Sequence, residues 1–425
     1  MFARLLEKVK GQGHGSLAEN IFSLVTIRGL EYVLAFLVFP YLVRVLGVDL
    51  YGTLVFYQSI IQYFILVVDF GFNLSGPKDI AKHDSLGERG LYFADIFWSK
   101  VLLLGGASLV CLCMLAYMVY VGNPYIWLFL AIYIGVVGNV LFPVWFFQGI
   151  QQMRYITMAN GLARLVSVIG IFTLVKGPSD YVLAGLFQAL PPVIAGCISF
   201  GILWRYYPET LQLSSWSRIK KTLKDSFHLF LSTVAMNLYT ATTTVVLGLL
   251  TNATVVGYYS AAYKIIGCVQ MVMAPISQAI YPHISKMVES SKNCTLVFLK
   301  NVTLILGGGN LVFSILLLVG ADPIVHLFLG SGYEESVLML RIMSVLPFII
   351  SLSNILGIQT MLPFGLQKQF SQIIMISAVL NFIVVIPLIY VWSGLGACVT
   401  MVMIESFVTL AMAWSVKKNI LGNRI

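Results

Sequence analysis

Charged residues are scarce in this 425-residue chain. Only 10% of the residues are Asp, Glu, Lys or Arg, whereas 59% are hydrophobic. Soluble domains carry about 25% charged residues, so no water-soluble fold could bury this much apolar surface. The deficit excludes a soluble protein and indicates a chain whose solvent is lipid. The formal net charge of +9 then bears on membrane topology rather than on nucleic-acid binding.

Motifs of covalent chemistry are also missing. The six cysteines have no metal-ligand or disulfide spacing, so they are interpreted as small apolar residues. The chain has no Gly-rich phosphate loop, no zinc-ligand spacing and no nucleophile–base set. We therefore expect neither an enzyme nor a bound metal or cofactor.

Long apolar runs follow one another along the chain. A run of about 20 apolar residues makes one membrane-crossing helix. The runs are continuously apolar and do not alternate as barrel strands would, so the sequence predicts an all-α membrane protein. The twelve expected spans are 21–43, 52–74, 97–120, 125–147, 156–175, 181–204, 228–250, 255–280, 296–319, 336–362, 371–391 and 395–416.

Basic residues are distributed unevenly among the polar segments. With the N-terminus in the cytoplasm, the cytoplasmic segments, to which Lys100 is assigned, carry 20 of the 26 Lys and Arg residues. The opposite side carries only Arg44 and Lys176. Cytoplasmic loops of membrane proteins are enriched in Lys and Arg. The distribution therefore predicts twelve transmembrane helices with both termini in the cytoplasm.

The two halves of the chain resemble each other. At an offset of 205 residues, Gly52 matches Gly257 and Pro77 matches Pro282. Each half has an even number of spans, so both halves share one orientation and the repeat is parallel. Two such bundles can rock about a central cavity. The predicted parts are an N-terminal six-helix bundle (1–204), a cytoplasmic linker (205–227) and a C-terminal six-helix bundle (228–425).

Two motifs resemble those of a known family, the Wzx O-antigen flippases of the polysaccharide-transport family. That family lies within the multidrug/oligosaccharidyl-lipid/polysaccharide exporter superfamily, and the resemblance covers essentially the whole chain. The motifs are Asp69-Phe70-Gly71-Phe72-Asn73 leading into Gly76-Pro77-Lys78-Asp79-Ile80-Ala81-Lys82, and Pro143-Val144-Trp145-Phe146-Phe147-Gln148-Gly149-Ile150-Gln151-Gln152-Met153.

The resemblance implies a function in lipopolysaccharide biosynthesis. Such flippases pass an oligosaccharide linked to undecaprenyl pyrophosphate from the cytoplasmic to the periplasmic leaflet of the bacterial inner membrane by alternating access. The implied partners are this substrate, membrane lipids, the polysaccharide polymerase and the chain-length regulator. The coupling ion, H⁺ or Na⁺, stays open, and no nucleic acid is expected.

Ionisable and polar residues inside the spans are the candidate site residues. A charge in the middle of a span costs about 3 kcal/mol unless it is paired or hydrated, so each such residue marks a pathway or a partner. The candidates for substrate binding are Arg28, Arg164, Lys264, Asn237 and Arg341, and the candidates for coupling or gating are Glu31, Asp69 and Glu405.

Each candidate also has a structural interpretation. Arg28 and Glu31 share one helix face. Either Arg28 meets the pyrophosphate, with Glu31 as its resting partner or a proton site, or the two residues form a structural ion pair. Lys264 has no acidic residue in its own span. This favours a cavity-lining cation over a side chain that extends to the membrane surface or pairs with a distant carboxylate. Asp69 either gates the inner mouth by pairing with a Lys or Arg, or makes a helix-end contact. Glu405 is either a coupling site for a proton or cation or the partner of Lys264 or Arg164.

The remaining candidates have alternatives of the same kind. Arg164 either lines the cavity or lies at another depth. Arg341 is near the outer end of its span, where its side chain can instead extend to the membrane surface. Asn237 belongs to an unusually polar seventh span, whose amides and hydroxyls suit either sugar recognition or helix–helix contacts.

Two rival functions differ in their expected charges and loops. A multidrug-type exporter of the same superfamily would carry cations, so acidic residues should dominate its cavity, whereas here Arg28, Arg164 and Lys264 outnumber Glu31 and Glu405. A polysaccharide polymerase or ligase would resemble proteins with a large basic periplasmic loop. The longest outward loop here has about sixteen residues.

Overall fold

The computed structural model describes residues 15–82 and 85–421. Within this range, the side chains of most residues before 36 and of some between 232 and 282 are not described. The described residues form helices and connecting turns, without strands. The helices of the first half are α2 (Gly15–Asp69), α3 (Phe72–Ile80), α4 (Leu86–Val121), α5 (Ile126–Leu141), α6 (Val144–Gly149), α7 (Met153–Leu174), η1 (Pro178–Asp180), α8 (Tyr181–Ala189), α9 (Pro191–Tyr206) and η2 (Pro208–Thr210).

The second half contains the longest uninterrupted helix, α11, and three π-helical segments, η3, η4 and η5. Its helices are α10 (Trp216–Leu250), α11 (Ala253–Ser290), α12 (Lys292–Val302), η3 (Thr303–Gly307), α13 (Gly308–Val319), α14 (Ala321–Phe328), α15 (Glu335–Met343), α16 (Leu346–Asn354), η4 (Ile355–Met361), α17 (Gln367–Val416) and η5 (Lys417–Leu421).

Twelve helical passes follow from these elements. Among the described residues, eight helices are long and apolar enough to cross a membrane. Two of them cross twice, because α2 turns back at Gly47 (φ 73°) and α17 turns back at Ser393 (φ 52°). The helices α10 and α11, with 35 and 38 residues, supply the last two passes. The structure confirms the predicted all-α membrane architecture.

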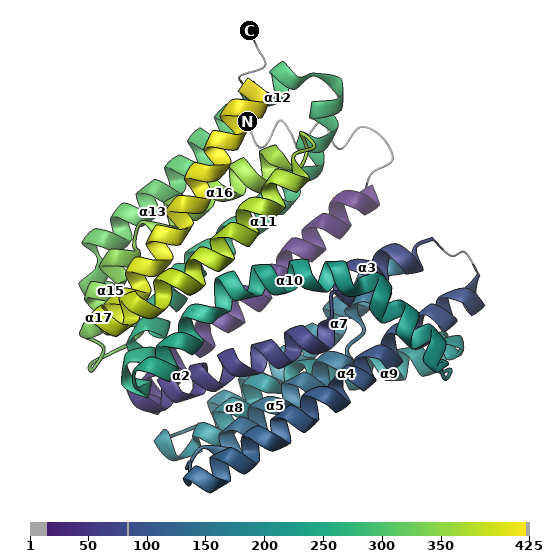
Figure 1. The fold of residues 1–425 in the computed structure, drawn as a ribbon, viewed down its shortest axis with the longest axis horizontal. Helices are drawn as coiled ribbons and strands as arrows, with labels where there is room; N and C mark the ends of the chain where they lie inside the picture. Colours follow the sequence, from purple (N-terminus) through teal and green to yellow (C-terminus); the bar gives the residue numbers. More distant parts are fainter. Residues whose placement is uncertain (1–14, 83–84, 422–425) are drawn as a thin grey trace.

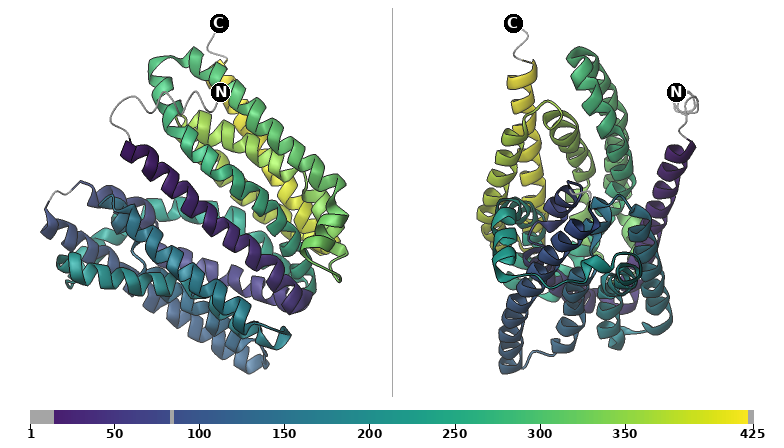
Figure 2. Two further views of the ribbon diagram at one scale, coloured as in Figure 1. Left: turned by 180° about the vertical axis from the view of Figure 1, so that it is seen from behind. Right: turned by 90° about the vertical axis from the view of Figure 1, so that its right-hand side faces the viewer.

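The helices form two groups that diverge toward one end (Figures 1 and 2). One group contains α3 to α9, and the other contains α11 to α17. The first half of α2 and the helix α10 run along the gap between the groups. The end of α17, the turn between α11 and α12, and the helix α3 lie toward the open end. The domain boundaries predicted from the sequence stay a prediction, and α10 already begins within the predicted linker.

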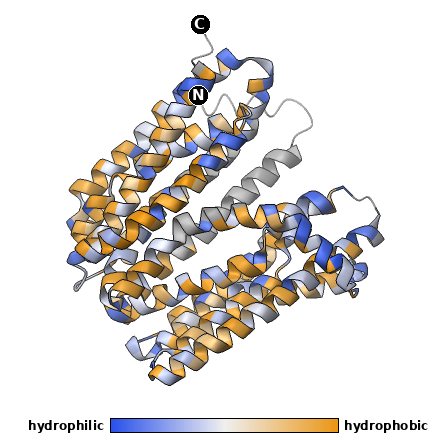
Figure 3. Ribbon diagram, in the orientation of Figure 1, coloured by the Kyte–Doolittle hydropathy of each residue, from blue (hydrophilic) through white to orange (hydrophobic). Residues whose placement is uncertain are grey.

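Hydrophobic side chains cover the outside of both groups. Figure 3 shows apolar residues along the middle of the helices and polar residues toward α3, α9 and α12. Large apolar side chains such as Leu109 (66% exposed) and Val319 (77% exposed) face outward. Large exposed apolar surfaces are rare on soluble monomers, and here they suit contact with lipid tails.

At the end opposite the open one, which we call the closed end, the backbones of α2 and α11 are in contact. A Cβ atom on Gly52 would lie 1.9 Å from the Ala253 carbonyl oxygen and 2.6 Å from the Gly257 nitrogen. A Cβ atom on Gly257 would lie 2.3 Å from the Val48 carbonyl oxygen. Only glycine allows this approach at both positions. The two glycines that match in the sequence repeat therefore touch each other in the structure.

Polar contacts reinforce this closed end. The Tyr333 hydroxyl donates to the Val43 carbonyl oxygen at 3.2 Å, and Tyr333 is 1% exposed. The Thr254 hydroxyl donates to an Asp49 carboxylate oxygen at 2.5 Å. Each contact joins the turn of α2 to the second half of the chain.

The two sequence motifs pack against each other in the first group. The segment between α2 and α3 turns sharply, with φ of 45° at Phe70 and 76° at Gly71. Gly76 of α3 lies against the Trp145 ring, since a Cβ atom there would be 2.9 Å from it. Gly149, at the end of α6, lies against Ile80, since a Cβ atom there would be 2.6 Å from the Ile80 side chain. The motifs thus shape a buried corner of the protein.

The start of α10 is tied to the first group. The Arg218 guanidinium donates twice to one Asp95 carboxylate oxygen, at 2.8 and 3.0 Å. The Ser214 hydroxyl donates to the other oxygen at 2.5 Å. Farther along α10, the Phe230 ring stacks on Phe70 with centroids 4.4 Å apart. On the other side, the Thr243 hydroxyl of α10 donates to the Met401 sulfur of α17 at 3.7 Å, so α10 contacts both groups.

Candidate functional site

A central cavity of about 340 Å³ lies between the two groups of helices. Its walls come from α2, α7, α8 and the start of α9 on one side, and from α10 and α11 on the other. Much of the wall is apolar, including Leu34, Val38 and Phe39 of α2. Its polar side chains include Gln58, Arg164, Gln188, Ser260, Tyr263 and Lys264.

Two cations from opposite sides face this cavity. Arg164 projects from α7 and is half-buried, and Lys264 projects from α11 and is solvent-accessible. In the part of the chain that the structure describes, no ion pair involves either residue. The described lining contains no Asp or Glu. The cavity therefore carries net positive charge and suits an anion.

Hydrogen-bond donors in the cavity lack protein acceptors. Within the described residues, the Arg164 Nε, the Gln188 Nε2 and the Ser260 hydroxyl are buried without a hydrogen-bond partner. The Gln188 Oε1 accepts from Gln58 at 3.1 Å, which fixes the direction of the amide. Leaving a buried donor unpaired costs about 1–3 kcal/mol, so a ligand rich in acceptor oxygens would be stabilised here.

The apolar wall of α2 lies beside these donors. Leu34, Val38, Phe39 and Leu42 line the same cavity as the two cations. A ligand that fits both surfaces needs an anionic group next to an apolar one. This combination describes an amphipathic anion better than a soluble metabolite.

The predicted site residues are only partly brought together. Arg164 and Lys264 meet in the central cavity. Arg28 and Glu31 belong to α2, but their side chains lie outside the described part of the structure. Because an α-helix rises about 1.5 Å per residue, Arg28 lies about 9 Å along α2 from Leu34 in the cavity wall.

Three other candidates lie away from the residues that line this cavity. Arg341 is exposed on α15. Asn237 is half-buried on α10, and its amide donates to the Thr233 carbonyl at 3.0 Å. Glu405 is buried in α17. The roles of these residues in binding or coupling stay predictions.

Asp69 pairs with a buried lysine. The Lys100 ammonium donates to Asp69 at 3.2 Å and to the Asn139 side-chain oxygen at 3.1 Å. Asn73 donates to the other Asp69 oxygen at 2.7 Å. The assignment of Lys100 to a cytoplasmic segment is wrong, because Lys100 is 1% exposed inside α4. The ammonium finds its partners within the bundle, which lowers the cost of burying its charge.

Sequence reasoning missed three polar residues of the central cavity. Gln58, Gln188 and Ser260 each interrupt an apolar run, which was the available signal. Polar residues interrupt many spans of this chain, however. Only the three-dimensional arrangement shows that these three converge on one space.

One family model and two named proteins are similar to this chain over most of its length. Residues 17–288 match a family model described as "Polysaccharide biosynthesis protein". The chain is 35% identical over 410 residues to a protein of Escherichia coli (strain K12) named "Putative O-antigen transporter", covering 95% of this chain and 97% of that protein. A Shigella dysenteriae protein of the same name is 28% identical over 405 residues, covering 94% and 100%.

Solved structures with similar folds are transporters. The lipid II flippase MurJ in an inward closed conformation aligns with a TM-score of 0.70 at 13% identity, covering 93% of this chain and 87% of that one. An inward-facing multidrug resistance MATE transporter of the MOP superfamily aligns with a TM-score of 0.67 at 13% identity, covering 92% and 96%. These likenesses confirm the predicted fold. Together with the named relatives, they confirm the prediction that this protein is a transporter and not an enzyme.

Proposed function

This chain belongs to the polysaccharide biosynthesis protein family, as a Wzx-type flippase, and on that premise we propose its substrate and its mechanism. The substrate is an oligosaccharide linked to undecaprenyl pyrophosphate. The protein moves it from the cytoplasmic to the periplasmic leaflet of the bacterial inner membrane by alternating access.

The observation that carries this proposal is the pair of cations in the central cavity. Arg164 and Lys264 come from opposite groups of helices and face one space. A pyrophosphate offers several anionic oxygens, which can accept from both cations and from the unpartnered donors of Gln188 and Ser260. The apolar wall of α2 suits the first part of a polyprenyl chain. The cavity thus matches the junction between the lipid and the headgroup.

The shape of the protein supports a rocking mechanism. The two groups of helices meet at Gly52 and Gly257 and diverge toward the end that holds α3 and α12 (Figure 1). The distribution of Lys and Arg supports an orientation in which that open end faces the cytoplasm. A substrate would enter there, bind between the groups, and leave when the glycine contact opens. Glu31, Asp69 and Glu405 are the proposed coupling or gating residues, with H⁺ or Na⁺ as the driving ion.

The test replaces each cation and measures surface polysaccharide. In a strain lacking its chromosomal copy, we expect Arg164→Ala and Lys264→Ala to reduce surface polysaccharide strongly, whereas Lys264→Arg retains most of it. Losing one charge-assisted hydrogen bond costs about 1.5–3 kcal/mol, or roughly a tenfold to hundredfold loss of affinity. Lys176→Ala is the matched control, because Lys176 is an exposed cation outside the cavity.

The proposal makes two distinct demands on these variants. Normal polysaccharide at a normal protein level in both alanine variants would refute the role of the two cations. Loss in Lys176→Ala as well would show a general sensitivity to charge. A multidrug-type exporter of organic cations is the weaker alternative, because the described lining of the central cavity has two cations and no carboxylate.

A further inference from the structure

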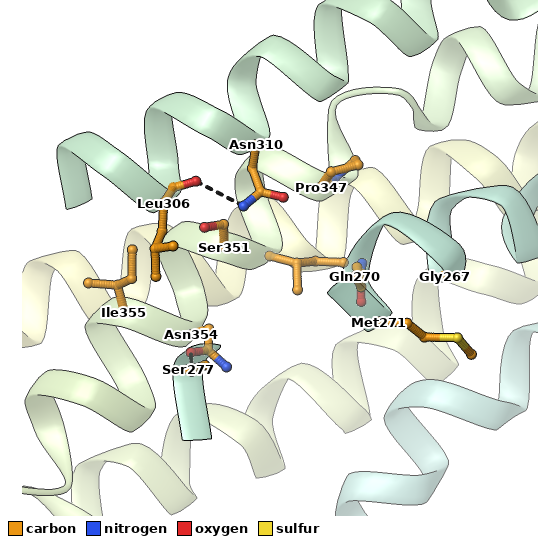
Figure 4. Close-up of a pocket in the computed structure, with 11 residues that line it drawn as sticks. Gly267, Gln270, Met271, Ser277, Leu306, Asn310, Pro347, Ser351, Asn354 and Ile355 are labelled. Carbon is orange, nitrogen blue, oxygen red and sulfur yellow. Dashed lines mark hydrogen bonds between the residues drawn. The ribbon is translucent and has the colours of Figure 1, made fainter. Parts of the chain in front are cut away.

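A second polar cavity lies within the C-terminal half of the chain (Figure 4). Its volume is about 310 Å³, and α11, α13 and α16 supply most of its walls. We call it the lobe pocket. Its lining contains five neutral polar side chains and no charged residue: Gln270, Ser277, Asn310, Ser351 and Asn354. A neutral polar pocket at membrane depth suits a ligand with hydroxyl or amide groups.

Some polar groups of the lobe pocket have no protein partner. Among the described residues, no hydrogen bond involves the Gln270 amide or the Ser351 hydroxyl. Asn310 is 1% exposed, and its Nδ2 donates to the Leu306 carbonyl at 2.8 Å, which leaves its Oδ1 to accept from a ligand. In Figure 4, the Asn310 amide and the Ser351 hydroxyl lie on the same side of the pocket.

Other polar groups hold the pocket in shape. The Ser277 hydroxyl donates to the Asn354 side-chain oxygen at 2.6 Å, and the Gln359 amide donates to the Ser277 hydroxyl at 2.7 Å. Two lining residues, Leu306 and Ile355, belong to the π-helical segments η3 and η4. Such segments interrupt the regular helix pattern and occur often at functional sites.

The lobe pocket and the central cavity are lined by neighbouring stretches of α11. Lys264, Gly267 and Met271 follow at i, i+3 and i+7, so they share one face of the helix. Lys264 lines the central cavity, and the other two line the lobe pocket. Gln270 lies about 9 Å along the axis from Lys264, toward the open end of the protein. A group attached directly to an anion at Lys264 can therefore reach the lobe pocket.

We propose that the lobe pocket binds the first sugar of the lipid-linked oligosaccharide, beside the pyrophosphate held by Arg164 and Lys264. This inference rests on the proposed function and adds the residues that recognise the sugar. Amide and hydroxyl side chains can donate to and accept from sugar hydroxyls, and Pro347 and Ile350 offer apolar contact to the ring. Ligand pockets measure about 300–1,000 Å³, so this one takes a single sugar and not a whole repeat unit.

Binding of two probes with a short isoprenoid tail tests the proposal. The first is farnesyl pyrophosphate, and the second is the same molecule carrying one hexose or N-acetylhexosamine on its terminal phosphate. Full-length protein in nanodiscs is titrated by calorimetry with both. For Ser351→Ala we expect affinity for the glycosylated probe to fall about fivefold, and for Gln270→Leu with Ser351→Ala about tenfold or more, since each lost hydrogen bond is worth about 1 kcal/mol. Affinity for farnesyl pyrophosphate should not change.

Two control variants separate the possible outcomes. Ser353→Ala removes a hydroxyl of the same helix that bonds to the Ile350 carbonyl and lies outside the lobe pocket, so it should bind both probes normally. Lys264→Gln should weaken both probes alike. If the Ser351 and Gln270 variants bind the probe with either sugar as tightly as the wild-type protein does, the sugar site is overturned while the proposed function stands. If wild-type protein binds neither probe, the proposed function fails, and the sugar site fails with it.

Discussion

Replacing Gly52 by alanine should weaken the closed end of the protein. The added Cβ atom would lie 1.9 Å from the Ala253 carbonyl oxygen and 2.6 Å from the Gly257 nitrogen. Both contacts are with backbone, so α11 must move away as a unit. Overpacking of this kind costs about 1–3 kcal/mol, and a cost of about 2 kcal/mol changes a population ratio roughly 30-fold. Because the clash exists only when this end is closed, the population should shift toward a state open on that side.

A cysteine at position 260 can report this opening. Ser260 lines the central cavity, is 6% exposed, and lies about one helical turn from Gly257. In a background without the six native cysteines, Ser260→Cys is labelled in spheroplasts with a membrane-impermeant maleimide. We expect faster labelling when Gly52→Ala is added. Gly257→Ala should have the same effect, and the double variant should gain less than the sum of both, because the two residues form one contact.

Gly105→Ala is the matched control. A Cβ atom at Gly105 would meet no atom within 4 Å, and alanine there should only improve helix propensity. Labelling of Ser260→Cys that is no faster with Gly52→Ala than without it, at normal protein level, would refute the reasoning. Equal acceleration by Gly105→Ala would show that the effect does not come from the glycine contact.

Two ion pairs give further predictions. Asp95→Asn should lower the unfolding temperature modestly, by the equivalent of about 1 kcal/mol, because Arg218 is partly exposed. Thermal unfolding in detergent measures this shift, and an unchanged midpoint would contradict the prediction. Lys100→Met should destabilise the protein by about 3–5 kcal/mol, because it leaves the Asp69 charge without its cation. Adding Asp69→Asn should restore part of that loss in the amount of folded protein, and no restoration would show that the pair is not the cause.

The fold was largely predictable from the sequence. Composition excluded a soluble protein, and the apolar runs gave twelve passes because only helices satisfy the backbone in lipid. The sharp turns at Gly47 and Ser393 fall between predicted spans. The extension of α10 back to Trp216 was not predicted, because its stability depends on contacts with distant residues such as Asp95.

The candidate site was less predictable, for a physical reason. A charge inside a span signals either a ligand or a partner, and the sequence does not say which. Lys100 and Lys264 illustrate both cases: Lys100 lies against Asp69 and Asn139, whereas Lys264 faces an open cavity. The partners of Lys100 come from other helices, 31 and 39 positions away, so no local pattern separates the two lysines.

The repeat explains why the closed end and the cavity differ in character. Residues related by a parallel repeat can touch each other only near the pseudo-twofold axis, and Gly52 and Gly257 do so. Rocking requires both halves to bend about that contact alike, so the matching glycines suit the motion. At the same offset Lys264 corresponds to Ser59, whose hydroxyl is bound to its own helix at the Val55 carbonyl. A lipid-linked headgroup has no twofold symmetry, and a cavity that binds one needs its charge on unmatched positions. Under the proposed mechanism, the chain would therefore keep its symmetry at the contact about which the halves rock and lose it in the cavity that binds the substrate.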